Sequence, residues 1–292
     1  MTNSKITDQI QLEQVYQTLV EKRQAIQAQA QKMERMEVTE DLDIPRGEHR
    51  LYRDRHVVLL GGGRSTVKGG VMMNINMDGR ERIWIDGRAS FENCVIEASK
   101  PCDLDGDDLS FRNCTFLFNP ESVQSGRLTL GEDISISNCV FYGGQKASLE
   151  LSGDCAVFAC SFVDWDDIDI SGDARECFFA NINLITCENV FDCVFHALSV
   201  IETPILLSGT MEGCTFDHIR LTNNAHLVRP NRDPARLSRC CFQDIRTSRA
   251  DKELFEEVYS YYDGLLFVRE KTEVNRFADR ASCIGLDSIK SL

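Results

Sequence analysis

The residues best suited to chemistry are the carboxylates of the run DWDDID, which are Asp164, Asp166, Asp167 and Asp169. Two carboxylates whose pKa values differ can serve as general acid and general base on a glycosidic bond, and several together can hold Ca²⁺. These four are therefore the candidate catalytic residues. The same run also fits a solvated outer face, which we favour, because acidic side chains keep a flat repeat protein soluble and discourage pairing at its edges.

The other side chains with reactive chemistry are not spaced for a metal, a cofactor or a nucleophile. The stretch GGGRSTVKGG lacks the Gly-Lys-Ser/Thr of a phosphate-binding loop. Cys240 and Cys241 are adjacent, so one of them faces outward if strand alternation holds, as a candidate reactive thiol. Five histidines lack zinc-ligand spacing, and they are His49, His56, His196, His218 and His226. We predict neither a metal nor a cofactor.

Positive charge is concentrated in the segment RPNRDPARLSRC, on a chain whose formal net charge is −14. Its Arg229, Arg232 and Arg236 are candidates for contact with an acidic protein partner. The overall negative charge opposes binding to phosphate backbones and to anionic membranes. The N-terminus shows no signal-peptide pattern, no apolar run is long enough for a bilayer, and the 13 cysteines fit a reducing compartment. We therefore expect a cytoplasmic protein that binds neither nucleic acid nor membrane.

The elements that must position these residues belong to an internal repeat. FENCVI at Phe91–Ile96 returns as FRNCTF at Phe111–Phe116, and similar pairs of Cys and apolar residue follow at roughly 21-residue spacing. Many are preceded by an alternating segment that ends in Gly, such as LELSG and IDISG, which predicts a short strand and a turn. The repeated cysteines are Cys94, Cys114, Cys139, Cys160, Cys177, Cys193, Cys214 and Cys241. This pattern predicts a solenoid of short strands.

Stacking of such repeats explains why Cys recurs. Each strand would pair with its equivalents in the neighbouring coils at about 4.8 Å, so inward side chains meet copies of themselves. A thiol at one level and a Phe two residues later can then form interdigitating columns. An Asn before three of the cysteines, at Asn93, Asn113 and Asn138, suits a turn. Leucine-rich repeats share the period and remain an alternative, although they need a leucine-dominated strand.

The repeated N-C-x-F after a strand ending in S-G or D-G resembles the right-handed parallel β-helix, the fold of pectate lyases and their non-enzymatic relatives. The resemblance covers roughly residues 57–244 and implies an all-β fold. The G-H-G and R-I-K signatures of polygalacturonase-like enzymes are absent, and no basic residue aligns beside DWDDID as in pectate lyases. The resemblance therefore transfers no catalytic role to any residue of this chain.

Two flanking regions complete the predicted organisation. Residues 1–44 are rich in Gln, Glu, Lys and Ala, without Gly or Pro from Ile6 to about Glu37, and predict an α-helix. An apolar heptad row there predicts either a coiled coil or a helix packed on its own domain, and it consists of Leu12, Leu19, Ile26 and Met33. Residues 45–246 form the β-helix. Residues 247–292 form a C-terminal cap, with a helix reaching Tyr262 and then a strand.

These features favour a non-catalytic scaffold or binding protein over an enzyme. Its rigid β-helix would present a surface to a protein partner, and the N-terminal helix would provide an oligomeric contact. The alternative is a carbohydrate-active β-helix enzyme, either a polysaccharide lyase or a glycoside hydrolase, that uses the carboxylates of the Asp164 to Asp169 run.

Overall fold

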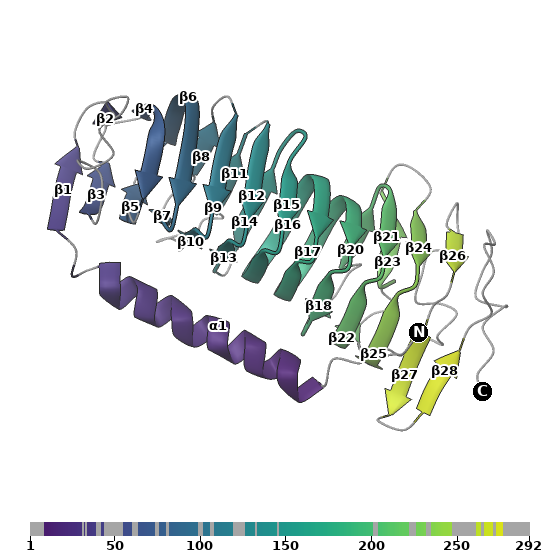
Figure 1. Cartoon of the computed structure of the whole chain (residues 1–292). Coiled ribbons are helices and arrows are strands. Elements are labelled where there is room, and N and C mark those ends of the chain that lie inside the picture. The colour runs from purple at the N-terminus through teal and green to yellow at the C-terminus, as the bar shows by residue number, and fades with distance from the viewer. Residues whose placement is uncertain are drawn as a thin grey trace.

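The protein is an all-β solenoid that carries an N-terminal helix, as seen in a computed structural model (Figure 1). Short strands wind into successive coils, and equivalent strands pair in parallel, which confirms the predicted parallel β-helix. The structure describes residues 9–30, 32, 34–38, 42–43, 55–59, 64–73, 76–79, 82–98, 102–105, 108–118, 126–131, 133–144, 146–200, 204–221, 226–231, 235–246, 261–263, 266–270 and 273–276.

The parallel pairings form three ladders, one for each side of the coil. The first ladder contains β1 (Glu34–Val38), β3 (Arg55–Leu59), β5 (Asn76–Gly79), β7 (Val95–Ala98), β10 (Thr115–Phe118), β13 (Val140–Tyr142), the starts of β16 (Ser161–Arg175) and β17 (Phe178–Phe191), β18 (Val194–His196), β22 (Thr215–Leu221), β25 (Cys241–Arg246) and β27 (Leu266–Glu270).

The second ladder contains β2 (Leu42–Asp43), the first parts of β4 (Arg64–Met73) and β6 (Arg82–Glu92), β8 (Cys102–Asp105), β11 (Gly126–Leu130), β14 (Ala147–Leu151), the middles of β16 and β17, β20 (Ile205–Leu207) and β23 (Val228–Pro230).

The third ladder contains the ends of β4 and β6, β9 (Leu109–Arg112), β12 (Ile134–Ser137), β15 (Ala156–Phe158), the ends of β16 and β17, β21 (Thr210–Glu212), β24 (Arg236–Ser238) and β26 (Tyr261–Asp263). Two further strands lie beside these ladders: β19 (Ser199–Val200) pairs with the end of β22, and β28 (Glu273–Arg276) is antiparallel to β27.

Parallel pairing extends past both predicted ends of the solenoid. The N-terminal helix α1 is Gln9–Ala30, shorter than expected, and Glu34–Val38 forms β1 instead of helix. Pairing with β1 satisfies backbone groups of β3 that would otherwise form an open edge, which outweighs local helix propensity. The predicted C-terminal helix is wrong at Tyr261 and Tyr262, which lie in β26, while the strand expected after it is β27. Residues 247–260 lie outside the described part.

The corners of the coil are made by residues in the left-handed region of backbone conformation. Asn93, Asn113 and Asn138 have φ of 53°, 52° and 53°, so the predicted Asn turns are confirmed. The backbone N–H of each donates to a carbonyl of the next coil, at 3.0 Å in all three cases. Equivalent positions before the later cysteines also have positive φ, namely Ala159, Glu176, Asp192, Gly213 and Arg239. Each turn therefore aims the following Cys into the core.

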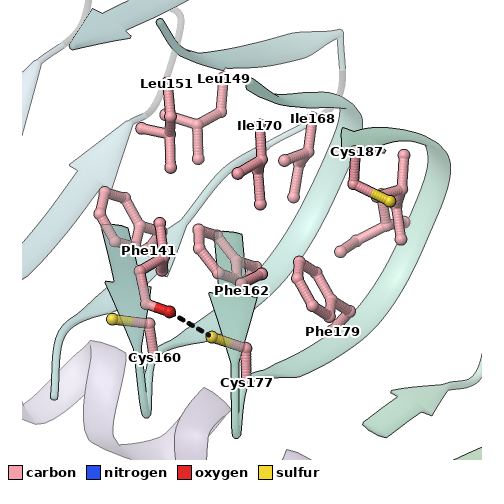
Figure 2. Packing of buried hydrophobic residues seen from close by; sticks show 14 of the residues in the cluster. Phe141, Leu149, Leu151, Cys160, Phe162, Ile168, Ile170, Cys177, Phe179 and Cys187 are labelled. Carbon is pink, nitrogen blue, oxygen red and sulfur yellow. Dashed lines mark hydrogen bonds between the residues drawn. The ribbon is translucent and has the colours of Figure 1, made fainter. Parts of the chain in front are cut away.

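The interior is the stack of matched side chains that the repeat predicts (Figure 2). Phe rings of successive coils stack nearly parallel, with centroids 4.9 Å apart between Phe141 and Phe162 and again between Phe162 and Phe179. That spacing matches the strand separation of about 4.8 Å, so the ladder itself sets the ring contact. Each buried Phe contributes about 1.5–3 kcal/mol relative to exposure.

A column of thiols runs beside the Phe column. Each Cys is buried, and its Sγ lies 3.3 Å from the carbonyl oxygen two residues earlier in Cys114, Cys139 and Cys160. In the coil of β24 and β25 the column residue is Cys240, not Cys241 as the sequence interpretation assumed, because Cys241 pairs with Thr215 on the outward side. None of the cysteines whose side chains the structure describes forms a disulfide.

Candidate functional site

Helix α1 lies along the outer side of the first ladder and runs from the coils near β22 towards β1 (Figure 1). Its 22 residues span about 33 Å, which is about seven coils of a parallel ladder. Tyr16 and Leu19 pack against outward-facing apolar residues of the sheet: Leu117, Val140, Tyr142, Val163, Phe178 and Ala180. A row that would be exposed in a bare solenoid is therefore buried.

Polar contacts fix the register of α1 on the sheet. The Tyr142 hydroxyl donates to the backbone carbonyl of Leu19 at 2.7 Å, and the Arg23 guanidinium lies 5.6 Å from the centroid of the Tyr142 ring. Burial raises the pKa of Tyr142 to about 12, so this hydroxyl keeps its proton as a donor. These contacts lie on the side of α1 that carries Leu19 of the heptad row. They match a helix packed on its own domain, which the sequence left open beside a coiled coil.

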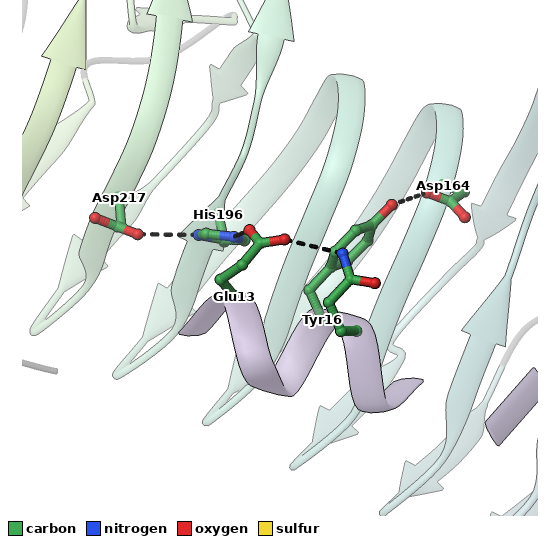
Figure 3. A network of polar contacts seen from close by, with 6 residues as sticks. Glu13, Tyr16, Asp164, His196 and Asp217 are labelled. Atoms are coloured by element: carbon green, nitrogen blue, oxygen red, sulfur yellow. Dashed lines mark hydrogen bonds and ion pairs between the residues drawn. The ribbon is translucent and has the colours of Figure 1, made fainter. Parts of the chain in front are cut away.

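The strongest polar feature of this contact is a histidine between two carboxylates (Figure 3). His196 on β18 has Nδ1 3.0 Å from Asp217 Oδ2 on β22 and Nε2 3.1 Å from Glu13 Oε2 on α1. Both ring nitrogens face acceptors, so both contacts are hydrogen bonds only when the ring is a doubly protonated imidazolium. We call this group the clasp: Glu13, His196 and Asp217.

The electrostatics of the clasp favour the charged ring. Burial lowers the pKa of His196, but the hydrogen bonds to Asp217 and Glu13 outweigh it and leave that pKa above its ordinary value. The pKa of Glu13 is lowered, first by the amide of Gln17 and then by His196. The second carboxylate oxygen of Asp217, Oδ1, is buried without a hydrogen-bond partner in the described part of the chain. The clasp therefore joins α1 to the solenoid through charge.

The clasp does not resemble an acid–base site that acts on a substrate. The side chains of His196 and Asp217 are 0 % and 1 % exposed, so no reacting group can approach the ring. Neighbouring rings close it further, since the Tyr16 ring centroid is 6.4 Å and the Phe178 ring centroid 6.2 Å from His196. The arrangement holds the helix in place.

A hollow of about 660 Å³ opens beside α1, where the chain turns from the first ladder to the second. It contains two of the predicted acids, Asp164 and Asp166, and it is lined by Tyr16, Arg23, Gly144, Lys146, Asp164, Trp165, Asp166, Asn181 and Asn183. Beside it the backbone passes close to Asp164: a side chain at Gly143 would place its first carbon 2.6 Å from the backbone oxygen of Asp164. The hollow is therefore a candidate small-molecule site.

The acids of the hollow are already engaged by the chain. Asp164 Oδ1 accepts from the Tyr16 hydroxyl at 2.9 Å and from the Asn181 amide at 2.8 Å, and Arg23 lies 3.9 Å from its other oxygen. Asp166 Oδ1 accepts from Asn183 at 2.6 Å. The pKa of Tyr16 rises to about 12 through burial and the nearby Asp164 charge. Asp164 thus anchors α1, like the clasp.

The remaining acids of the run face outward from the second ladder and are not among the residues that line the hollow. Asp167 and Asp169 are in register with Ser148 and Glu150 of the previous coil. Burial raises the pKa of Asp167, and the neighbouring charges of Asp169, Asp166 and Glu150 add to the rise while Arg127 opposes it. The structure therefore divides the predicted acidic site between two places.

The other predicted residues are also separated. Arg229 and Arg236 are exposed, but they lie on the second and third ladders, so the basic segment does not form one patch there. Arg232, Met33 and the side chains of Leu12 and Ile26 lie outside the described part. Burial raises the pKa of Cys241 to about 11, which argues against the predicted reactive thiol.

The outer side of the third ladder carries a feature that the sequence interpretation missed. One position per coil, in register through the ladder, forms what we call the third-face row, whose last member is buried: Glu92, Arg112, Ser137, Phe158, Arg175, Phe191, Glu212 and Ser238. Each member stands two residues before a column Cys, and this spacing could have identified the row from the sequence.

The centre of the third-face row is aromatic and cationic. The Phe158 side chain is 46 % exposed, and in the described part of the chain only Val15, at 43 %, is another exposed large apolar side chain. On the following coils the Arg175 guanidinium lies 4.6 Å from the centroid of the Phe191 ring. Aromatic residues and Arg are the types enriched at the centres of protein interfaces. Small residues flank them, since Ser135 and Ala156 are also exposed.

Comparisons with protein-family models, curated proteins and solved structures give no match to this chain. Among the described residues, no three His, Cys, Asp or Glu side chains gather as a metal site would require. In the same part of the chain, no helix has the length and apolar character needed to cross a membrane.

Proposed function

We propose that this protein is a non-catalytic binding protein whose rigid β-helix presents its third face to a protein partner. The observation that carries the proposal is the exposed Phe158 beside Arg175 and Phe191, on a face that also exposes the small residues Ser135 and Ala156. Such a centre gains free energy when a partner removes it from water, while the stacked core behind it keeps the surface from rearranging. The proposal places the chain with the non-enzymatic relatives of pectate lyases that its repeat resembles.

The contacts that the polar side chains make within the chain support binding over catalysis. Among the described Asp, Glu, His, Lys and Arg residues the most buried are His196 and Asp217, and they hold α1. Asp164 is engaged by three side chains of its own chain. A catalytic acid and base need access to the same substrate atom, which the clasp does not offer. The outward row of the first ladder is covered by α1, so an assembly through that side of the helix would first require α1 to leave the sheet.

The test of this proposal compares two exposed apolar residues. Tagged wild type, Phe158→Ser and Val15→Ser are used to capture proteins from an extract supplemented with the untagged chain. Val15 is the matched control, because it is as exposed as Phe158 but lies on α1. We expect a protein that wild type and Val15→Ser retain and Phe158→Ser loses. Equal capture by all three proteins would contradict binding through the third face.

A second candidate function is a carbohydrate-active enzyme, favoured by the position of Asp164 and Asp166 in a hollow of about 660 Å³ and by the raised pKa of Asp167. A carboxyl group with a raised pKa beside ionised carboxylates is a pattern of glycoside hydrolysis. Wild type, Asp166→Asn and Asp167→Asn incubated with a broad panel of soluble polysaccharides test it. Release of reducing or unsaturated ends by wild type alone would support the enzyme, and inactivity of all three counts against it.

A further inference from the structure

We propose that the third face binds a second copy of this chain, with the two solenoids antiparallel and face to face. This inference rests on the proposed function, because it names the partner of the same surface. A two-fold axis along the strand direction would bring the third-face row against itself in reverse order. Such an interface is isologous, so each contact between two different residues occurs twice.

The charges of the row fit this reversed pairing. Reversal places Arg112, the second member, against the partner's Glu212, the second from the other end, where the Glu212 carboxylate also pairs with Arg239 of its own chain. At the centre, Phe158 meets the partner's Arg175, whose guanidinium already stacks on a Phe ring and pairs with Asp173 of its own chain. A cation between two aromatic rings gains from both faces when water leaves. At the ends, Glu92 approaches the partner's Arg236 and the partner's Arg239.

The neighbouring alignments are opposed by like charges. A shift of one coil in one direction centres the axis on Phe158 and puts Glu92 against the partner's Glu212. A shift in the other direction centres it on Arg175 and puts two guanidinium groups against each other. Like charges facing across an interface cost several kcal/mol. The reversed order centred between Phe158 and Arg175 avoids both conflicts, so the row specifies one register.

The size of the face sets the expected affinity. Seven ladder steps from Glu92 to Ser238, at about 4.8 Å each, and a face about 20 Å wide with its corners provide roughly 700 Å² from each copy. The total of about 1,400 Å² lies in the lower half of the range for specific interfaces. Because the centre of this interface has a single exposed ring, we expect a dimer with a dissociation constant in the micromolar range.

The decisive experiment uses charge reversal and sedimentation equilibrium on the full chain. Arg112→Glu alone and Glu212→Arg alone should each weaken self-association by about 10-fold or more, because each variant faces its own copy with two like-charge pairs. An equal mixture of the two variants should dimerise as wild type does. In the mixed dimer one pair is reversed and the other is native, so both are complementary. Only an antiparallel contact between these two positions predicts this rescue.

A matched control separates the charge effect from general effects of substitution. Arg127→Glu reverses an exposed, ion-paired Arg on the second ladder and should leave self-association unchanged. Wild type that remains monomeric up to about 200 µM, above the expected micromolar range, would rule out a second copy as the partner. Dimers that both variants retain, or a mixture that stays monomeric, would rule out this register. In either case the capture experiment with Phe158→Ser still decides the proposed function.

Discussion

The outer sides of the first and third ladders start from the same backbone and end with opposite properties. Both have parallel strands in register and inward side chains packed in one core, such as Phe162 on the first ladder and Val157 on the third. On the first side the outward residues are large and apolar, with a buried charged clasp, and α1 covers them. On the third side most are small or charged, and Phe158 stands exposed among them. The difference shows that outward residues, and not the ladders, decide what each side binds.

The substitution with the largest expected effect tests whether inward and outward side chains contribute differently to the free energy of unfolding. Phe162→Ala removes a ring from the stacked column and should lower the free energy of unfolding by about 3–5 kcal/mol, because it leaves a cavity between close-packed coils. Phe158→Ala, four residues earlier on the third side, should change it by about 0.5 kcal/mol or less. Denaturant unfolding of both variants provides the measurement. Similar losses would mean that Phe158 is part of the core.

The next prediction compares how much charged pairs on the first and third sides contribute to the free energy of unfolding. Asp217→Ala leaves a buried His196 with only one carboxylate and should cost about 3 kcal/mol of unfolding free energy. Asp173→Ala breaks the exposed pair with Arg175 on the third side, where the Arg side chain is 57 % exposed, and should cost less than about 1 kcal/mol. Equal costs in denaturant unfolding would contradict a special role for the clasp.

The clasp also makes the first side sensitive to pH. The folded pKa of His196 is raised, so its contribution is complete below the ordinary His pKa and is lost as pH rises through the raised value. The pKa of Glu13 is lowered, so its contribution is present above the ordinary Glu pKa and is lost as pH falls through the lowered value. Docking of α1 should therefore be strongest in mildly acidic solution and weaken on the alkaline side.

Hydrogen-exchange protection of the α1 amides across this pH range measures docking directly. His196 faces Glu13 and Tyr16 of α1 and Asp217 and His218 of β22, so the protonation of His218 must be followed separately by NMR. His196→Gln should abolish the pH dependence between neutral and alkaline conditions, whereas His218→Gln should retain it. Protection in wild type that is flat from mildly acidic to alkaline pH would show that charge on His196 does not hold the helix.

The sequence predicted the contacts that repeat in every coil and missed the contacts that occur only once in the chain. The columns through Cys139 and Phe141 follow from a period visible in the sequence, because stacked coils force equal side chains into contact. The contact between Tyr16 and Asp164 joins residues 148 positions apart and leaves no periodic signal. The acids at Asp164 and Asp166 were identified as candidates, but their engagement by Asn181 and Asn183 depends on the register of adjacent coils. Composition alone does not contain that register.

The substitution with the smallest expected effect on the free energy of unfolding lies in α1. Leu19→Ala removes part of a half-buried side chain from the first side and should lower the free energy of unfolding by about 1 kcal/mol. Val15→Ala, on the exposed side of α1, should change it by about 0.5 kcal/mol or less.

Measurement at several protein concentrations separates two causes of the Leu19 effect. A Leu19 effect that is independent of concentration follows from packing within one chain, because only one molecule is involved. An effect that grows with concentration would instead show that α1 binds another copy, as the coiled-coil alternative predicts.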